Sequence, residues 1–213
     1  MVSLHDLITD ALKTSPADYT EIRLEKREST RIIYRGRRLE SVDMSIDRGG
    51  IVRCLCAKGG WGISTFNSLE DLPARVEQAY QGAKAVVAEP IELAPIPAIE
   101  DYISVTLERD FRGVPLAEKK ALIEGYSAIL LSYPLIVDTT AIYSDAFTRV
   151  YYGNSEGTYI EEERPSCGIR LVAIARDGDK VEQAHDGLAL PRGFETVVGQ
   201  EGLAHRIAQR ATE

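Results

Sequence analysis

The sequence predicts an α+β fold of two related subdomains, each a mostly antiparallel twisted sheet flanked by helices. The chain has 213 residues, of which 44% are apolar and 27% are charged, and this composition is typical of globular chains of one or two domains. Apolar and polar residues alternate over long stretches punctuated by glycines, which indicates antiparallel strands joined by turns. Both halves repeat one order of helix, strands and helix, which favours an internal duplication.

The first predicted element is a helix that begins after Ser3 and ends at Ser15-Pro16. Ser3 and Asp6 form the Ser-x-x-Asp signal that is typical of a helix start. Apolar residues recur at the spacing of one helical face, namely Leu4, Leu7, Ile8, Ala11 and Leu12.

Strands are expected to follow, because alternation with a period of two replaces the helical spacing. Their predicted ranges are 19–24, 32–34, 42–46, 51–57 and 61–66, with turns at 35–38 and 59–60 and with Gly49-Gly50 introducing the strand at 51–57. The sequence therefore predicts an antiparallel meander in the first half of the chain.

A second helix is expected after Ser68, with Asp71 three residues later and an apolar side from Leu72 to Val87. Residues 90–97 then contain three prolines, which disfavour helix and predict an extended linker. We therefore expect an N-terminal subdomain at residues 1–88, a Pro-rich linker at 89–100 and a middle subdomain at 101–213.

The second half is expected to repeat this plan. A strand at 102–107 precedes a helix in which Pro115 occupies the first turn and residues 116–130 supply the apolar face. Five strands are expected next, at 135–143, 147–152, 158–163, 168–175 and 180–188, with turns at 153–157 and 177–178. A last helix is predicted from Phe194 to Ala211.

The charge balance argues against nucleic acid as a direct partner. The chain has 25 basic and 33 acidic side chains, which gives a formal net charge of −8, whereas proteins that bind phosphate backbones are basic.

The longest apolar stretch, 126–137, is about half of the roughly 20 residues that a spanning helix needs, and no secretory signal is visible. Together with only three cysteines, these features predict a cytoplasmic protein with no membrane partner.

Arg53 and Trp61 are the candidate cleft-lining residues. Trp61 stands between Gly60 and Gly62, and glycine permits close approach of another backbone. Two positions remain open for its ring, which either is buried against the second helix or lines a cleft. No residue of the chain is expected to be catalytic or to bind metal.

Other chemically suggestive residues are interpreted as structural. Cys54 and Cys56 share one face of a predicted strand and are expected to be small core side chains. Cys167 follows no strand-to-helix elbow and has no predicted histidine neighbour, so we expect no nucleophile there.

Glu201 and His205 lie one helical turn apart, but Gln200 stands where a first histidine ligand would be needed. An amphipathic surface helix is the interpretation that we favour for this segment.

A basic run composed of Arg31, Arg35, Arg37 and Arg38 lies near a predicted hairpin tip. These side chains either contact an acidic partner or nucleic acid, or they form a solvated turn. The acidic balance of the chain favours the solvated turn.

Several segments, in order and spacing, resemble the TldD/PmbA family of metallopeptidases, which are also called modulators of DNA gyrase. The first half carries the segments 18–23, Asp-Tyr-Thr-Glu-Ile-Arg, 49–53, Gly-Gly-Ile-Val-Arg, and 60–64, Gly-Trp-Gly-Ile-Ser, followed by a helix with Ala79 and Ala83. The second half carries 152–157, Tyr-Gly-Asn-Ser-Glu-Gly, and 164–168, Arg-Pro-Ser-Cys-Gly. The resemblance therefore extends over nearly the whole chain and covers the N-terminal and middle regions of the family.

The resemblance implies a role without catalysis for these residues. Family members carry a His-Glu-x-x-x-His helix in their C-terminal half, in which two imidazoles bind zinc and the glutamate acts as general base. That motif does not occur in this chain, which is predicted to be inactive alone, whereas zinc is expected in a full-length member. The helical pattern still continues at Glu213, which favours a longer native protein.

By resemblance, the chain would shape the substrate cavity and hold a partner subunit, as a homodimer or a heterodimer with another family member. The substrate would be a peptide or an unfolded protein, and strand addition to an exposed sheet edge is one mechanism of recognition that fits. The alternative is a stand-alone, non-catalytic protein-binding or scaffold homologue. A role in nucleic-acid modulation is suggested only by the older family name.

Overall fold

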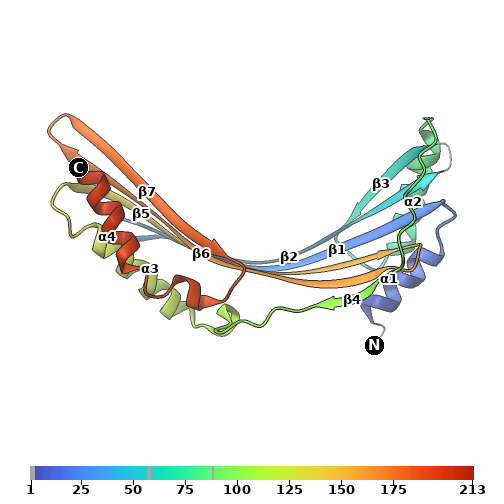
Figure 1. The fold of residues 1–213 in the computed structure, drawn as a ribbon, viewed down its shortest axis with the longest axis horizontal. Coiled ribbons are helices and arrows are strands. Elements are labelled where there is room, and N and C mark those ends of the chain that lie inside the picture. Colours follow the sequence, from blue (N-terminus) through green and yellow to red (C-terminus); the bar gives the residue numbers. More distant parts are fainter. Residues whose placement is uncertain (1–2, 57–58, 88) are drawn as a thin grey trace. The chain divides into compact units, whose positions relative to one another are not determined.

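The computed structural model describes residues 3–56, 59–87 and 89–213, and it confirms the predicted α+β class (Figure 1). In chain order the elements are α1 (Leu4–Lys13), β1 (Tyr19–Arg35), β2 (Arg38–Cys56), β3 (Gly60–Phe66), α2 (Leu72–Ala85), β4 (Glu100–Ile103), η1 (Phe111–Gly113), α3 (Leu116–Leu130), β5 (Ile136–Asn154), β6 (Tyr159–Asp177), β7 (Lys180–Leu190), η2 (Phe194–Val197) and α4 (Glu201–Thr212). The hydrogen-bonded strand order is β3-β2-β1-β5-β6-β4, and β7 also pairs with β6.

The chain forms two compact units, and neither unit is one continuous stretch of sequence. Unit 1 contains Met1–Arg27, Asp47–Ser104 and Thr148–Glu163, whereas unit 2 contains Glu28–Ile46, Val105–Phe147 and Arg164–Glu213. The long strands β1, β2, β5 and β6 each contribute residues to both units. The predicted division into residues 1–88, 89–100 and 101–213 is based on position in the sequence, whereas the two units are defined by contacts in space. The predicted domain boundaries therefore stay a prediction.

Several predicted strand boundaries are wrong, because single strands continue through glycine and proline positions that lie between separately predicted strands. The Gly49-Gly50 pair lies inside β2, and a Cβ atom at Gly50 would overlap the ring of Phe66. Pro165 lies inside β6 between Glu162, where the pairing with β4 ends, and Cys167, where the pairing with β7 begins. Pro165 thus has no partner in β4 or β7, and proline occurs in strands at such breaks in the pairing.

Helix starts were predicted correctly where side chains cap the backbone. Ser3 and Asp6 form the expected capping box of α1. The predicted cap of the second helix is wrong, because α2 begins at Leu72 and the Ser68 hydroxyl accepts from Glu70 N–H outside the helix. The last predicted helix is two segments, η2 and α4, and Gly199 between them adopts φ +73°, which a helix cannot contain.

The predicted strand 102–107 is also displaced. It is the short strand β4 at Glu100–Ile103, which pairs with β6 in parallel orientation.

Among the described residues, no helix combines the length and apolar character needed to cross a bilayer.

In unit 1, α1 and α2 cover one face of the strands, and glycines set how closely they approach. A methyl group at Gly60 would overlap the carbonyl oxygen of Ala83, and one at Gly62 would overlap that of Ala79. Likewise, a Cβ atom at Gly153 would lie 2.8 Å from Ile8 Cγ2 on α1. The expected close backbone approach at Gly60 and Gly62 is therefore confirmed, and its partner is α2.

In unit 2, α3 and α4 cover one face of the strands. The core between them contains Ile123, Tyr126, Leu130, Leu203 and Ile207, packed on Tyr143 and Leu171 of the sheet. The hydroxyl of Tyr126 donates to Val197 O at 2.6 Å and accepts from Gln200 N–H at 3.0 Å. This buried hydroxyl fixes the segment that joins η2 to α4.

We predict that Gly62→Ala lowers the free energy of unfolding by about 1–3 kcal/mol, because the new methyl group overlaps the backbone of α2. The matched control is Gly82→Ala on the helix side of the same contact, where a Cβ atom would lie 3.5 Å from Gly62 Cα, an ordinary contact. We expect Gly82→Ala to be neutral or to stabilise by up to about 1 kcal/mol, because alanine favours helix. Urea unfolding of both variants checks this, and equal stability of Gly62→Ala and wild type would contradict it.

Candidate functional site

A cluster of aromatic and charged side chains lies on the face of unit 1 that points away from α1 and α2. Side chains alternate along a strand. Because Gly60 and Gly62 face α2, Trp61 faces the other side, where its ring lies edge-on to Tyr19 with the centroids 6.1 Å apart. The alternative in which Trp61 is buried against the second helix is therefore not the one adopted.

The centre of this cluster is the buried carboxylate of Glu21. The hydroxyls of Tyr19 and Tyr152 donate to Glu21 Oε2 at 2.8 and 3.2 Å, and the two hydroxyls lie 2.9 Å apart. The Arg53 guanidinium forms an ion pair with Glu21 Oε1 and lies 5.7 Å from the centroid of the Trp61 ring. A carboxylate removed from water requires such partners, so the cluster is held together by its charge.

The tyrosine hydroxyls of the cluster are hydrogen-bond donors and not general acids or bases. Burial, followed by the hydrogen bonds to Tyr152 and Glu21, raises the pKa of Tyr19 far above its usual value. Burial also raises the pKa of Tyr152. Both hydroxyls therefore keep their protons at neutral pH, and the arrangement suits recognition of a ligand better than proton transfer.

A cavity of about 360 Å³ opens beside this cluster. Tyr19, Glu21, Trp61 and Tyr152 line it from the strands, and Leu93, Ala94, Ile96 and Ile99 line it from the Pro-rich segment. The segment is anchored at Ile99, whose carbonyl accepts from Tyr159 N–H at 2.8 Å and whose N–H donates to Thr158 Oγ1 at 3.3 Å. Aromatic and apolar walls with a few fixed polar groups are typical of ligand sites.

Trp61, one of the two predicted site residues, lines this cavity, and Arg53 lies beside it against the Trp61 ring and Glu21. Tyr19, Glu21 and Tyr152 were missed as site residues. The signal available for the first two was the alternation that places Tyr19, Glu21 and Arg23 on one strand face. Nothing local pairs them with Tyr152, which lies more than 130 positions away in sequence.

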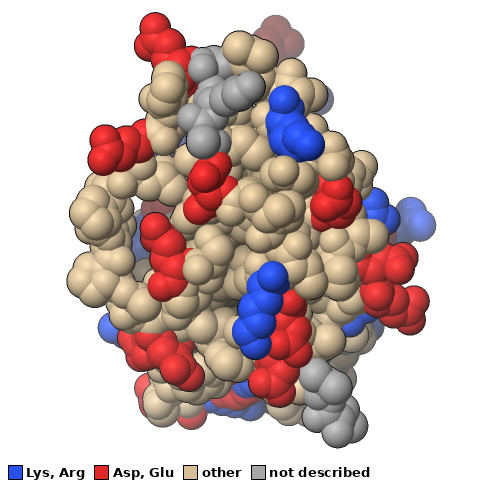
Figure 2. Space-filling model, turned by 90° about the vertical axis from the view of Figure 1, so that its right-hand side faces the viewer, with Lys and Arg blue, Asp and Glu red and all other residues tan. Residues whose placement is uncertain are grey.

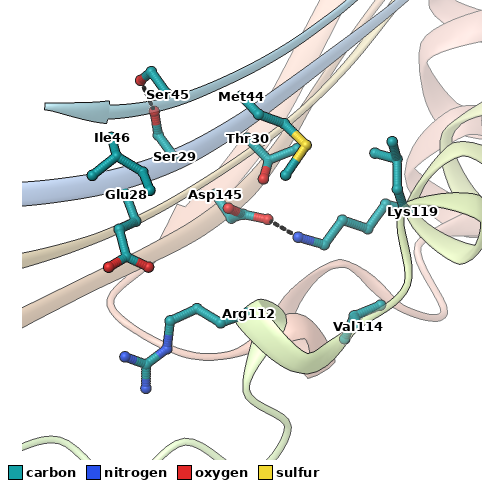
Figure 3. A pocket seen from close by; sticks show the side chains of 11 residues that line it. Glu28, Ser29, Thr30, Met44, Ser45, Ile46, Arg112, Val114, Lys119 and Asp145 are labelled. Carbon is teal, nitrogen blue, oxygen red and sulfur yellow. Dashed lines mark hydrogen bonds and ion pairs between the residues drawn. The ribbon is translucent and has the colours of Figure 1, made fainter.

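A second pocket, of about 330 Å³, lies in unit 2 (Figure 3). Lys119 extends from α3 toward Asp145 on β5, and their charged atoms are 2.5 Å apart, with only 6% and 4% of the two side chains exposed. Tyr143 also donates to Asp145 Oδ2. Lys119 was overlooked although it occupies the apolar face of its helix, three residues after Leu116 and four before Ile123.

The cysteines are free and structural, in accord with their interpretation from sequence. Burial raises the pKa of the Cys167 thiol to about 11, and Tyr143 is its neighbour at 3.7 Å. Burial also raises the pKa of Cys54 and of Cys56. A thiol that keeps its proton is a poor nucleophile.

The segment around His205 is an amphipathic helix, as expected. Leu203, Ala204, Ile207, Ala208 and Ala211 form its buried face. His205 is exposed, and its Nδ1 lies 3.1 Å from the Tyr133 hydroxyl. Within residues 3–56, 59–87 and 89–213, no group of three or more His, Cys, Asp or Glu side chains is placed to hold a metal ion.

The predicted basic run is divided by the structure. Arg35 pairs with Glu40 at 3.1 Å and with Asp138 at 3.8 Å beside the turn, which fits the solvated hairpin. Arg31 instead lies on the open face of the strands of unit 2. Figure 2 shows a different face, on the side of α2 and β3, where acidic and basic side chains are interspersed and the basic ones do not gather into a patch.

Removing one partner of the buried ion pair should strongly destabilise the fold. We predict that Lys119→Met lowers the free energy of unfolding by about 3–5 kcal/mol, because Asp145 is left buried and uncompensated. The double variant Lys119→Met/Asp145→Asn should recover part of this loss, because the unpaired charge is gone. Denaturant unfolding of the single and double variants checks the prediction, and additive losses would contradict it.

Alkaline pH should destabilise the protein partly through Cys167. Because folding raises the pKa of this thiol from 9.0 to about 11, its contribution is present below pH 9 and is lost as the pH rises toward 11. We expect wild type to lose about 2 kcal/mol more stability between pH 8 and pH 11 than Cys167→Ala does. Urea unfolding monitored by the fluorescence of Trp61 measures the difference, and identical pH dependence in the two proteins would refute the assignment.

Comparison with known proteins places the chain in a family. The family model described as PmbA/TldA metallopeptidase domain 1 matches residues 20–85, and the one described as PmbA/TldA metallopeptidase central domain matches residues 109–213. A metalloprotease of Synechocystis sp. is 34% identical over 201 residues, which are 93% of this chain and 43% of that protein.

Solved structures show the same fold at low sequence identity. TldE from Thermococcus kodakarensis has a TM-score of 0.75 at 16% identity, over 99% of this chain and 47% of that one. A candidate modulator of a DNA gyrase from Thermotoga maritima has a TM-score of 0.77 at 15% identity, over 91% of this chain and 44% of that one. The chain spans less than half the length of these relatives. With both domain models matched in their expected order, the chain belongs to the PmbA/TldD family of metallopeptidases.

Proposed function

We propose that this chain forms the substrate-cavity and assembly part of a zinc metallopeptidase of the TldD/PmbA family, acting on peptides or unfolded proteins. The matches to the first and central domains of the family support this role, as does the metalloprotease name of the Synechocystis relative. Assembly as a homodimer or heterodimer is part of the proposal by family resemblance. So is a cytoplasmic location, which three free cysteines favour.

The described residues do not fit a zinc ion, because zinc sites need three or four clustered His, Cys or carboxylate ligands and these residues contain no such group. We therefore assign to them no step of peptide hydrolysis. The zinc and its general base, in this proposal, belong to other residues of the assembled enzyme. The role left for this chain is to bind and orient the peptide.

The observation that carries the proposal is the Trp61 cavity beside an unpaired strand edge. β3 ends the strand order, so the edge of β3 that faces away from β2 has no strand partner among the described residues. An extended peptide can add to such an edge through its backbone, and its alternate side chains then lie on one face. On β3 that face carries Trp61 and Ile63, which is 59% exposed.

The cavity chemistry favours an extended, partly apolar segment. Tyr19 and Trp61 offer rigid aromatic surface, and Leu93 and Ile96 offer apolar surface opposite them. The Arg53–Glu21 pair holds this surface in place and has little charge left to offer a ligand. Unfolded polypeptides expose such segments, whereas folded proteins bury them.

The test is a titration of the chain with a fluorescein-labelled extended peptide, followed by anisotropy. We expect saturable binding that falls at least tenfold, roughly the effect of one interfacial hot spot, in Trp61→Ala. The matched control is Tyr133→Ala, which removes a partly exposed aromatic ring from unit 2 and should leave affinity unchanged.

The backbone part of the proposal is tested with the same peptide carrying N-methyl groups on alternate amides. These groups remove the hydrogen bonds of strand addition and leave the side chains intact, so binding should be lost for one of the two methylation registers. Equal affinity for both methylated peptides and the parent, together with no effect of Trp61→Ala, would contradict the proposed site.

A further inference from the structure

A groove of about 810 Å³ lies on the face of the unit 2 strands opposite α3 and α4. Alternation along the strands defines this face, since Ile32, Tyr143 and Leu171 are buried on the helix side. The groove is lined by the intervening positions, which include Arg31 on β1, Ser144 on β5, Arg170 on β6 and His185 on β7.

The floor of the groove is hollow because two glycines, Gly168 on β6 and Gly187 on β7, lie diagonally across the strand pair. Gly187 is the register partner of Arg170, and Gly168 is the partner of Ala189. A Cβ atom at Gly187 would lie 2.5 Å from Ile169 O, and one at Gly168 would lie 2.5 Å from Leu188 O. Side chains are thus excluded at both positions, and the flank of Arg170 stays open.

Two guanidinium groups line this groove without acidic partners. Among residues 3–56, 59–87 and 89–213, neither Arg31 nor Arg170 has a side-chain hydrogen bond or ion pair, and both are exposed. The arginines elsewhere show the contrast, since Arg35, Arg53 and Arg109 all pair with glutamates. Guanidinium groups without an acidic partner are notable in a chain with a net charge of −8, because acidic side chains that could pair with them are plentiful.

The other polar groups of the groove are also able to donate hydrogen bonds. Thr140 and Ser144 contribute hydroxyls, and His185 contributes an imidazole. Among the described residues that line the groove, Asp186 is the only carboxylate, and its Oδ1 accepts from the Gly187 N–H. A matching ligand therefore carries negative charge and acceptor oxygens, and guanidinium groups bind carboxylates with two parallel hydrogen bonds.

We propose that this groove binds acidic side chains of an extended peptide, so that the assembly selects substrates rich in Asp and Glu. This inference rests on the proposed function and adds the substrate class. A peptide fits better than nucleic acid, because the described residues of the lining include no Phe, Tyr or Trp ring to serve as a stacking platform for bases. Ile142 and Val172 offer apolar contact between the charges, which suits the methylene groups of glutamate.

The experiment compares a labelled peptide of alternating glutamate and threonine with the same peptide carrying glutamine at each glutamate, by anisotropy at low salt. We expect the chain to bind the glutamate peptide about tenfold more tightly, the scale of one charged hydrogen bond. The double variant Arg31→Gln/Arg170→Gln should lose this preference and still bind the glutamine peptide normally.

Arg37→Gln is the matched control, because it removes an exposed charge at the hairpin turn outside the groove and should keep the preference. Thermal unfolding of each variant shows that the exposed substitutions leave the fold intact. If the glutamate preference persists in the double variant, or if both peptides bind equally, the groove proposal is wrong and the proposed function stands. If no peptide binds at all, both fail.

A single-stranded DNA of similar charge provides the remaining comparison. Binding of this DNA that depends on Arg31 and Arg170, without the glutamate preference, would overturn the peptide assignment in favour of nucleic acid. Absence of DNA binding together with a glutamate preference lost in the double variant supports it.

Discussion

The close approach of α2 to β3 is the constraint on which the candidate site depends. Only glycine fits at Gly60 and Gly62, where any side chain would overlap the helix backbone. With the helix seated directly on the strand, alternation sends Trp61 to the opposite face, where Tyr19 and Arg53 meet it. The fold thus uses one face of unit 1 to build a core and leaves the other for an aromatic cavity.

The two faces of each unit differ in the same physical way. Helices cover one face with apolar contacts. The other face carries charges that are paired, as Arg53 with Glu21, or that have no partner among the described residues, as at Arg31 and Arg170. Paired charges hold a surface rigid, and open charges attract a partner of opposite sign. In the proposed function, the fixed cavity would receive side chains of an extended peptide and the open charges would select among sequences.

Local signals in the sequence predicted the parts of the fold that local interactions determine. The capping pair of Ser3 and Asp6 and the glycine turn at Asp177-Gly178 are examples. Strand ends were predicted less well, because Gly50 is required by the Phe66 ring on a neighbouring strand and not by a turn. Of the site, Arg53 and Trp61 could be proposed from sequence, but Glu21 and Tyr152 meet only through the pairing of distant strands.

The most direct test of the account is the NMR signal of the Trp61 indole N–H, which is unique because the chain contains one tryptophan. During titration with an extended peptide, the account predicts a saturable shift of this signal with the same dissociation constant that anisotropy gives. A peptide that binds while the indole signal stays in place would show that the cavity is not the peptide site.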